Sequence, residues 1–230
     1  MNPFADLLSL FYPQVCHACG EKLLKKGLEE VICLRCQYHL PKTGFHLLAD
    51  NPVTQKFWGR VNVQHGTAMY YFTKEGRVQT LVHKLKYQDK PEVGIKLGQM
   101  TGTMLATSEL YSDIDLIVPV PLHPKKLRLR GYNQASMFAQ GISETFGKPW
   151  TEEAVRRGVH TETQTRKNRF ERFLNVEYAF LPGDTATFQN KHILLVDDVL
   201  TTGSTIESCA NILLTIPGVR VSVACIAVAL

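Results

Sequence analysis

Long apolar runs are missing from this sequence: nothing approaches the roughly eighteen consecutive apolar residues of a transmembrane helix, so we expect no membrane span. A large excess of one charge is also missing, because 26 basic and 21 acidic side chains leave a net charge of +5. Internal repeats and low-complexity segments are absent. With 44% hydrophobic and 20% charged residues over 230 positions, the composition excludes disordered and collagen-like chains. It is typical of one medium domain with an appendage, or of two small domains.

The N-terminal segment is apolar but lacks the basic leader of a signal peptide and carries Asp6. We therefore predict no signal peptide and a cytoplasmic location. The mild positive charge permits a nucleic acid or a phosphate-rich partner without requiring one.

Four of the six cysteines fall in one short stretch, as two C-x2-C pairs separated by thirteen residues: Cys16, Cys19, Cys33 and Cys36. Two such pairs can direct four thiolates tetrahedrally at one Zn²⁺ ion, and a filled four-thiolate shell has no open position for a substrate. We predict a structural zinc site, with His17 and His39 as less favoured substitute ligands. Disulfides are the competing interpretation, but a reducing cytoplasm disfavours them.

Three segments follow from the change in sequence pattern: a zinc-binding module at 1–45, a loose linker at 46–60 and a main domain at 61–230. The module is too small for an adequate core, so the metal must supply most of its folding energy. In the main domain, periodicity predicts strands at 61–65, 68–72, 116–118, 193–196 and 219–228, and helices around 78–85, 95–105, 133–146 and 204–216. This alternation predicts an α/β fold with a mostly parallel sheet.

The segment 193–205 carries the most chemical information. A buried apolar strand is followed by two carboxylates, Asp197 and Asp198, and then by a small hydroxyl-rich loop that opens a helix: Thr201, Thr202, Gly203, Ser204 and Thr205. Ligands of open α/β sheets bind beyond the carboxyl ends of the strands. Backbone N–H groups at a helix N-terminus suit a phosphate, and adjacent acids suit vicinal hydroxyls or a magnesium-bound sugar. Together they indicate a ribose 5-phosphate; an ordinary capped helix after a strand is the alternative.

The stretch 196–203 resembles the phosphoribosyl pyrophosphate (PRPP) signature of type I phosphoribosyltransferases. The resemblance implies that Asp197 and Asp198 are the catalytic acids at the ribose hydroxyls, with Mg²⁺ bound alongside PRPP. It also implies that the loop 201–205 holds the 5-phosphate. The segment Pro119-Val120-Pro121 resembles the pyrophosphate loop of the same families, although a strand that simply ends at proline would look alike.

The order of motifs resembles that of the ComF/GntX family over almost the whole chain. The four-cysteine module comes first, then the proline loop, the segment 130–135, a Gln164…Arg169 segment and the PRPP signature. The resemblance implies a type I phosphoribosyltransferase-like fold behind a small zinc-ribbon-like module. It also implies a role in natural competence, in which single-stranded DNA is handled beside a helicase or a recombination mediator.

Basic residues concentrate between His123 and Arg172, where eleven Lys or Arg face five Asp or Glu. Such a cluster can neutralise a pyrophosphate, or it can bind single-stranded DNA if aromatic side chains lie nearby, and Tyr87 and Tyr132 lie close to basic residues. A solvated helix face is the plain alternative for any one lysine. The candidates for nucleic-acid binding are Lys125, Lys126, Arg128, Arg130 and Tyr132, with His83, Lys84 and Lys86 as a weaker patch.

Three functions remain open from the sequence. The first is a PRPP-binding competence protein that links a sugar-phosphate site to single-stranded DNA or a helicase. The second is an active phosphoribosyltransferase, for which the base-selecting hood is not identified; the segment 176–180 is one candidate. The third is a zinc-stabilised scaffold with a vestigial site, which the intact acids and the intact Thr-Thr-Gly-Ser-Thr loop disfavour.

Overall fold

The computed structural model describes residues 13–23, 31–158 and 180–230, and its centre is a four-stranded parallel sheet. Its strands run in the order β1-β6-β5-β2 and comprise β1 (Gly66–Tyr71), β2 (Leu116–Pro119), β5 (His192–Leu200) and β6 (Arg220–Val228). A separate antiparallel pair joins β3 (Val155–Arg157) to β4 (Phe180–Pro182). The α/β class with a mostly parallel sheet, predicted from the sequence, is confirmed.

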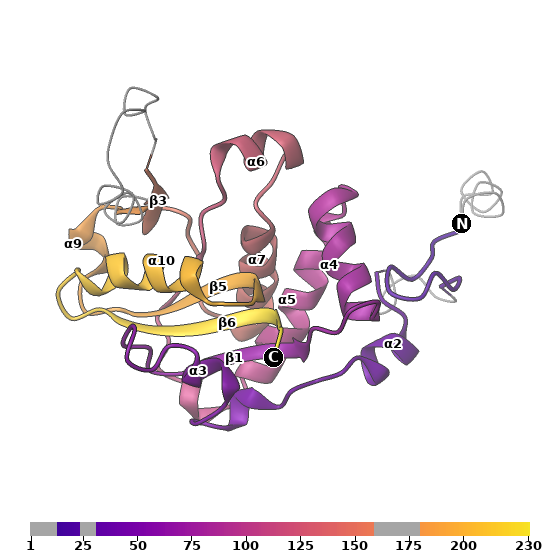
Figure 1. The fold of residues 1–230 in the computed structure, drawn as a ribbon, viewed down its shortest axis with the longest axis horizontal. Helices are drawn as coiled ribbons and strands as arrows, with labels where there is room; N and C mark the ends of the chain where they lie inside the picture. Colours follow the sequence, from indigo (N-terminus) through magenta and orange to yellow (C-terminus); the bar gives the residue numbers. More distant parts are fainter. Residues whose placement is uncertain (1–12, 24–30, 159–179) are drawn as a thin grey trace.

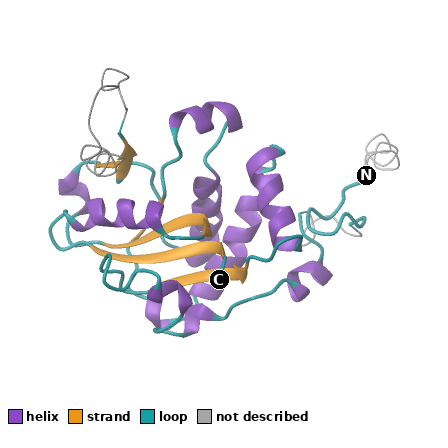
Figure 2. Cartoon of the chain, viewed as in Figure 1, coloured by secondary structure: helices purple, strands orange, loops and turns teal. Residues whose placement is uncertain are grey.

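Helices cover both faces of the sheet (Figures 1 and 2). One face packs against α4 (Arg77–Tyr87), α5 (Pro91–Leu105) and α7 (Gln134–Phe146), and the other against α3 (Pro52–Gln55) and α10 (Ser204–Leu214). Along β5, Leu194 and Val196 join the first hydrophobic cluster, whereas Ile193 and Leu195 join the second. Because alternate side chains point to opposite faces, a strand buried on both faces reads as a continuous apolar run.

The other elements connect these layers: η1 (Phe45–Leu47), η2 (Glu109–Tyr111), α2 (Leu34–His39), α6 (Pro124–Arg130) and α9 (Thr185–Phe188). In Figure 1, α6 stands at the top of the molecule, away from the sheet, and none of its residues is buried. Within the described ranges, no helix has the length and apolar character needed to cross a membrane.

A close crossing of α5 and α7 fixes the position of α7. A Cβ at Gly141 would collide with the carbonyl oxygen of Ile95, and a Cβ at Gly98 would collide with the carbonyl oxygen of Phe138. Glycine at both positions lets the two backbones touch. The N-terminus of α7, beside the loop after β2, is placed by this contact.

Two predictions from the sequence are wrong. Residues 61–65 form no strand: Val61 and Val63 pack partly against the second cluster, which explains the alternation, while the strand itself begins at Gly66. The linker predicted at 46–60 is no loose connection, because Val53 and Phe57 are buried in that cluster.

The predicted zinc-binding module packs on the main body. Its residues Cys16, Ile32 and Leu40 lie in the same hydrophobic cluster as Leu81 and Leu85 of α4. The division at residues 45 and 60 stays a prediction, but the described part of the module shares its core with the helices beside the sheet.

Candidate functional site

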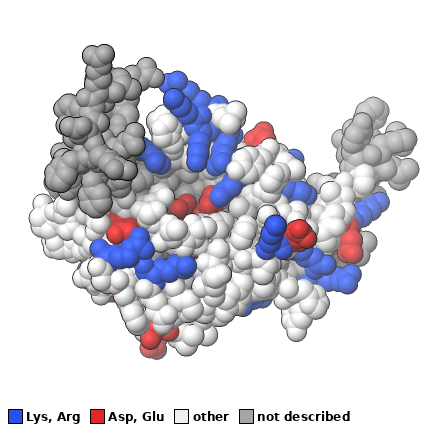
Figure 3. Space-filling model, viewed as in Figure 1, with Lys and Arg blue, Asp and Glu red and all other residues white. Residues whose placement is uncertain are grey.

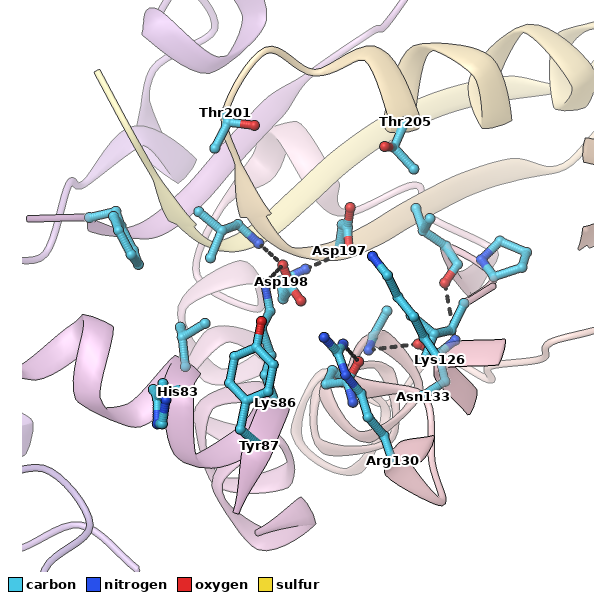
Figure 4. A pocket seen from close by; sticks show the side chains of 18 of the residues that line it. His83, Lys86, Tyr87, Lys126, Arg130, Asn133, Asp197, Asp198, Thr201 and Thr205 are labelled. Carbon is cyan, nitrogen blue, oxygen red and sulfur yellow. Dashed lines mark hydrogen bonds and ion pairs between the residues drawn. The ribbon is translucent and has the colours of Figure 1, made fainter. Parts of the chain in front are cut away.

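A cavity of about 630 Å³ opens at the carboxyl ends of β5 and β2 (Figure 4). These two strands are neighbours, and the Val120 N–H donates to the Val196 carbonyl at 2.9 Å, which lays the proline loop beside Asp197. The residues lining the cavity include many of the predicted site residues: Val120, Pro121, Lys126, Arg130, Asp197, Asp198, Thr201 and Thr205. Pro119 is buried at the end of β2 and does not line it.

The two carboxylates lie within β5 rather than beyond its end, since the strand continues to Leu200. The prediction of a strand ending at Val196 is therefore too short. Each acid accepts a hydrogen bond from the next backbone N–H: Asp197 Oδ1 from Asp198 at 2.8 Å, and Asp198 Oδ1 from Val199 at 2.5 Å. The backbone thereby holds both carboxylates at the floor of the cavity, as Figure 4 shows.

The neighbouring acids have different electrostatic surroundings. Burial and, next, the adjacent Asp198 carboxylate together raise the pKa of Asp197 to about 7, against the lowering effects of the Asp198 N–H and of the positive charges of Lys86 and Arg157. Asp198 has a direct counter-ion, because its Oδ1 accepts from Lys86 Nζ at 2.8 Å. The side chains of this pair are only 15% and 22% exposed, so solvent screens it weakly. A proton-binding carboxyl and a paired carboxylate therefore lie side by side.

The loop 201–205 turns from β5 into α10. Gly203 makes this turn with φ +81°, and a Cβ there would lie 3.1 Å from the Phe57 ring. Thr201 and Thr205 face the cavity from the side opposite α4, as Figure 4 shows. Thr202, Gly203 and Ser204 do not line it: the Thr202 hydroxyl lies 3.1 Å from that of Ser204, and the Thr202 carbonyl accepts from Arg60 at 3.0 Å.

The basic candidates on α6 divide into two groups. Lys126 and Arg130 line the cavity, and Lys126 points toward Asp197 in Figure 4. Lys125 and Arg128 are exposed and do not line it. In Figure 3, basic side chains gather over α6, next to a hollow that contains acidic side chains.

Tyr132, predicted as a stacking residue, is half-buried. It packs against the first hydrophobic cluster, and its hydroxyl donates to the Leu85 carbonyl at 2.6 Å. This hydrogen bond joins the turn before α7 to the last turn of α4. The segment 164–169 and residues 176–179 of the hood candidate lie outside the described residues.

Other lining residues were not assigned to the sugar-phosphate site from the sequence, among them Lys86, Tyr87, Asn133 and Arg157. Asn133 caps α7 by accepting from the Ala135 N–H at 3.2 Å, and its amide donates to the Val120 carbonyl at 3.0 Å. Arg157 reaches the Pro121 carbonyl at 3.4 Å. The asparagine two residues after Gly131 was a visible helix-capping signal. Its hydrogen bond to the carbonyl of Val120, a residue on another loop, could not be read from the sequence.

A second candidate site is the cysteine cluster. All four sulfur atoms lie within 4.8 Å of one another, and the Sγ atoms of Cys19 and Cys33 are 3.9 Å apart. Four ligands at the usual Zn–S distance of about 2.3 Å are about 3.8 Å apart in a tetrahedron. All six cysteines are free thiols. The arrangement can hold one metal ion, and four thiolates are donors that suit zinc.

The thiols of this cluster differ in acidity. Burial would raise the pKa of Cys16, but N–H groups of Cys33, Cys19 and Ala18 outweigh it and lower the pKa to about 7, whereas burial raises the pKa of Cys19 and Cys36. His17 instead contacts Glu92, with Nε2 and Oε1 3.4 Å apart. The His39 ring packs on Tyr38, 5.1 Å between centroids. Four cysteines thus complete the cluster without either histidine.

The chain is similar to curated proteins from three bacterial lineages. DNA utilization protein YhgH of Escherichia coli K12 is 32% identical over 152 residues, 64% of this chain and 65% of that protein. Competence protein F of Haemophilus influenzae is 31% identical over 137 residues, 58% of this chain and 60% of that one. Competence protein ComFC of Bacillus subtilis is 32% identical over 204 residues, 87% of this chain and 78% of that protein.

No protein-family model matches the chain. Among solved structures, the glutamine PRPP amidotransferase of B. subtilis is 18% identical, with a TM-score of 0.42 over 61% of this chain and 30% of that one. Adenine phosphoribosyltransferase of Leishmania tarentolae is 11% identical, with a TM-score of 0.38 over 77% of this chain and 88% of that one. The parallel sheet and the four-cysteine cluster described above agree with the α/β fold and the N-terminal cysteine module predicted from the sequence.

Proposed function

Because the chain belongs to the ComF/GntX family, we propose that it binds PRPP together with Mg²⁺ at the carboxyl ends of β5 and β2 and acts in natural competence. The names of two relatives, Competence protein F and Competence protein ComFC, support the role in DNA uptake and transformation. The match spans 65% of the length of the YhgH proteins, whose name, DNA utilization protein, also refers to the use of DNA.

One observation carries the PRPP assignment: groups suited to each part of PRPP line the same cavity from separate segments. Asp197 and Asp198 would accept the ribose hydroxyls, while Thr201 and Thr205 would bind the 5-phosphate. The loop 119–121 would receive the pyrophosphate.

Positive charge lies where the pyrophosphate would need it. Lys126 and Arg130 approach from α6, and Arg157 from β3. Mg²⁺ usually keeps several waters and is held by one or two carboxylates together with substrate phosphates, and this site offers that donor set. When bound, the ion would neutralise part of the pyrophosphate charge.

The test is calorimetry with PRPP and Mg²⁺. We expect Asp198→Asn to weaken PRPP binding by about 1.5–3 kcal/mol, the range for hydrogen bonds to charged groups. Asp184→Asn is the matched control, since Asp184 caps α9 outside the cavity and asparagine is an equally good cap. Equal PRPP affinity in parent and Asp198→Asn would refute the assignment.

An active phosphoribosyltransferase of unknown base is the second candidate. Its supporting observation is that Tyr87 and Arg130 line the cavity beside the acids, where an acceptor base could contact them. In such a transfer, the bond from the anomeric ribose carbon to pyrophosphate breaks as a base nitrogen bonds to that carbon. Pyrophosphate release with one candidate base would establish turnover; PRPP binding without release would favour the binding protein.

Single-stranded DNA and a helicase or recombination mediator are the proposed partners. The exposed side chains Lys125, Lys126 and Arg128 of α6 support the proposal of DNA as a partner, because the phosphates of DNA need neutralising charge. The structural ion is proposed to be Zn²⁺ at Cys16, Cys19, Cys33 and Cys36. A cytoplasmic location stays a prediction.

A further inference from the structure

Two planar side chains meet at the rim of the cavity. Tyr87, in the last turn of α4, is 65% exposed, and the guanidinium carbon of Arg130, at the end of α6, lies 5.1 Å from the centre of its ring. The His83 ring lies 5.0 Å from the Tyr87 ring, one helical turn earlier. Tyr87 and Arg130 stand together in Figure 4, across the cavity from Thr201 and Thr205.

This pair is fixed by contacts of its own. Arg130 donates to Gln134 Oε1 at 2.7 Å, which orients the guanidinium from the first turn of α7. Tyr132 lies two residues after Arg130, in the turn between α6 and α7. Its hydroxyl donates to the Leu85 carbonyl of α4 at 2.6 Å. The two helices that carry the planar groups are therefore joined directly beside them. Tyr87 itself is 65% exposed, so its large aromatic ring contributes little to the hydrophobic core.

The position of the pair points to its ligand. Tyr87 and Arg130 line the same cavity as the acids proposed for the ribose hydroxyls, and Lys86, the residue before Tyr87, bonds one of those acids, Asp198. A base that is bonded to that ribose, or positioned to react with it, would contact the planar groups of Tyr87 and Arg130. Aromatic rings and guanidinium planes both stack on bases, and such stacking tolerates every base.

We propose that Tyr87 and Arg130 form a stacking platform for a nucleobase. The platform rests on the proposed function in one respect: the ribose-phosphate site places the sugar next to it. The base is either a free acceptor or one base of single-stranded DNA, and both share the same planar chemistry. Lys126, beside the platform, supplies charge for the phosphates of either ligand.

The test separates bases from phosphates. The parent protein, Tyr87→Ala and Tyr87→Phe are titrated with a short labelled oligothymidylate, and with an abasic oligonucleotide of equal length. Free nucleobases are titrated in the presence of PRPP and Mg²⁺. Tyr38→Ala is the control, because Tyr38 on α2 is 78% exposed and lies outside the cavity.

A stacked base accounts for about a 5- to 140-fold change in affinity on truncation to alanine. We expect that loss in Tyr87→Ala for the base-bearing ligand, little loss in Tyr87→Phe or Tyr38→Ala, and no change for the abasic strand. Arg130→Lys should weaken base binding while keeping the salt dependence, because lysine retains the charge without the plane. A loss confined to free bases or to the oligothymidylate identifies the source.

Equal affinities in parent and Tyr87→Ala, an equal loss for the abasic strand, or no binding of any base-bearing ligand by the parent would overturn the platform. PRPP titration of the same proteins keeps the two proposals apart. If Tyr87 serves only the base, Tyr87→Ala should bind PRPP as tightly as the parent does. A parent that binds no PRPP removes the ribose-phosphate site instead.

Discussion

The adjacent acids of β5 should have opposite effects on stability when each is replaced by asparagine. Asp197 binds its proton more tightly in the folded protein, with a pKa of about 7 against 3.8 for an ordinary aspartate. As pH rises from 4 to 7, the unfolded chain therefore loses this proton first, and folding becomes less favourable. The stabilising effect of protonation is complete below about pH 4 and lost as pH rises through about 7.

The size of the effect follows from the two pKa values. At 1.36 kcal/mol per unit, the penalty for ionised Asp197 is on the order of 4 kcal/mol at pH 8 and 2 kcal/mol at pH 5. Asp197→Asn removes this penalty and keeps an oxygen to accept the Asp198 N–H. We expect the variant to be more stable than the parent at both pH values, with a margin about 2 kcal/mol larger at pH 8.

Asp198→Asn should have the opposite sign. It breaks the half-buried bond to Lys86 Nζ and leaves that ammonium without its carboxylate, at a cost of about 1–3 kcal/mol. Urea unfolding of the parent and both variants at pH 5 and pH 8, followed by circular dichroism, measures all three free energies. An Asp197→Asn margin that is zero, or the same at both pH values, would refute the reasoning.

Three further outcomes are expected. Cys33→Ser should lower the zinc content and the unfolding temperature, as checked by metal analysis and calorimetry; full occupancy and unchanged stability would exclude the four-thiolate site. Lys126→Ala should weaken PRPP binding, whereas Lys125→Ala should spare it and reduce the salt slope of single-stranded DNA binding by about 0.7, with identical slopes excluding this DNA path. Gly141→Ala should cost about 1–3 kcal/mol in urea unfolding, because its Cβ meets the Ile95 backbone; a neutral substitution would contradict the close crossing.

The sheet could be predicted because its strands are buried on both faces. Continuous apolar runs at 193–196 and 219–228 have few other interpretations, and β5 and β6 contain them. The segment 46–60 could not be recognised by the same means, since its order comes from a four-residue helix. Its signal was chemical: Asn51 and Thr54 form a capping box around Pro52, and Phe57 reaches the core from beyond it.

Site residues that are close in sequence could be predicted, whereas those brought together from distant positions could not. Asp197, Asp198, Thr201 and Thr205 all lie within the short segment 197–205, so one stretch of sequence predicts their joint presence at one end of a strand. Lys86 is more than a hundred positions away and reaches Asp198 only because α4 packs on the sheet face beside β5. In the sequence it is one of several lysines on a helix face, with nothing to distinguish it from Lys84. Which lysine neutralises an acid is decided by packing, and the same packing sets Tyr87 beside Arg130.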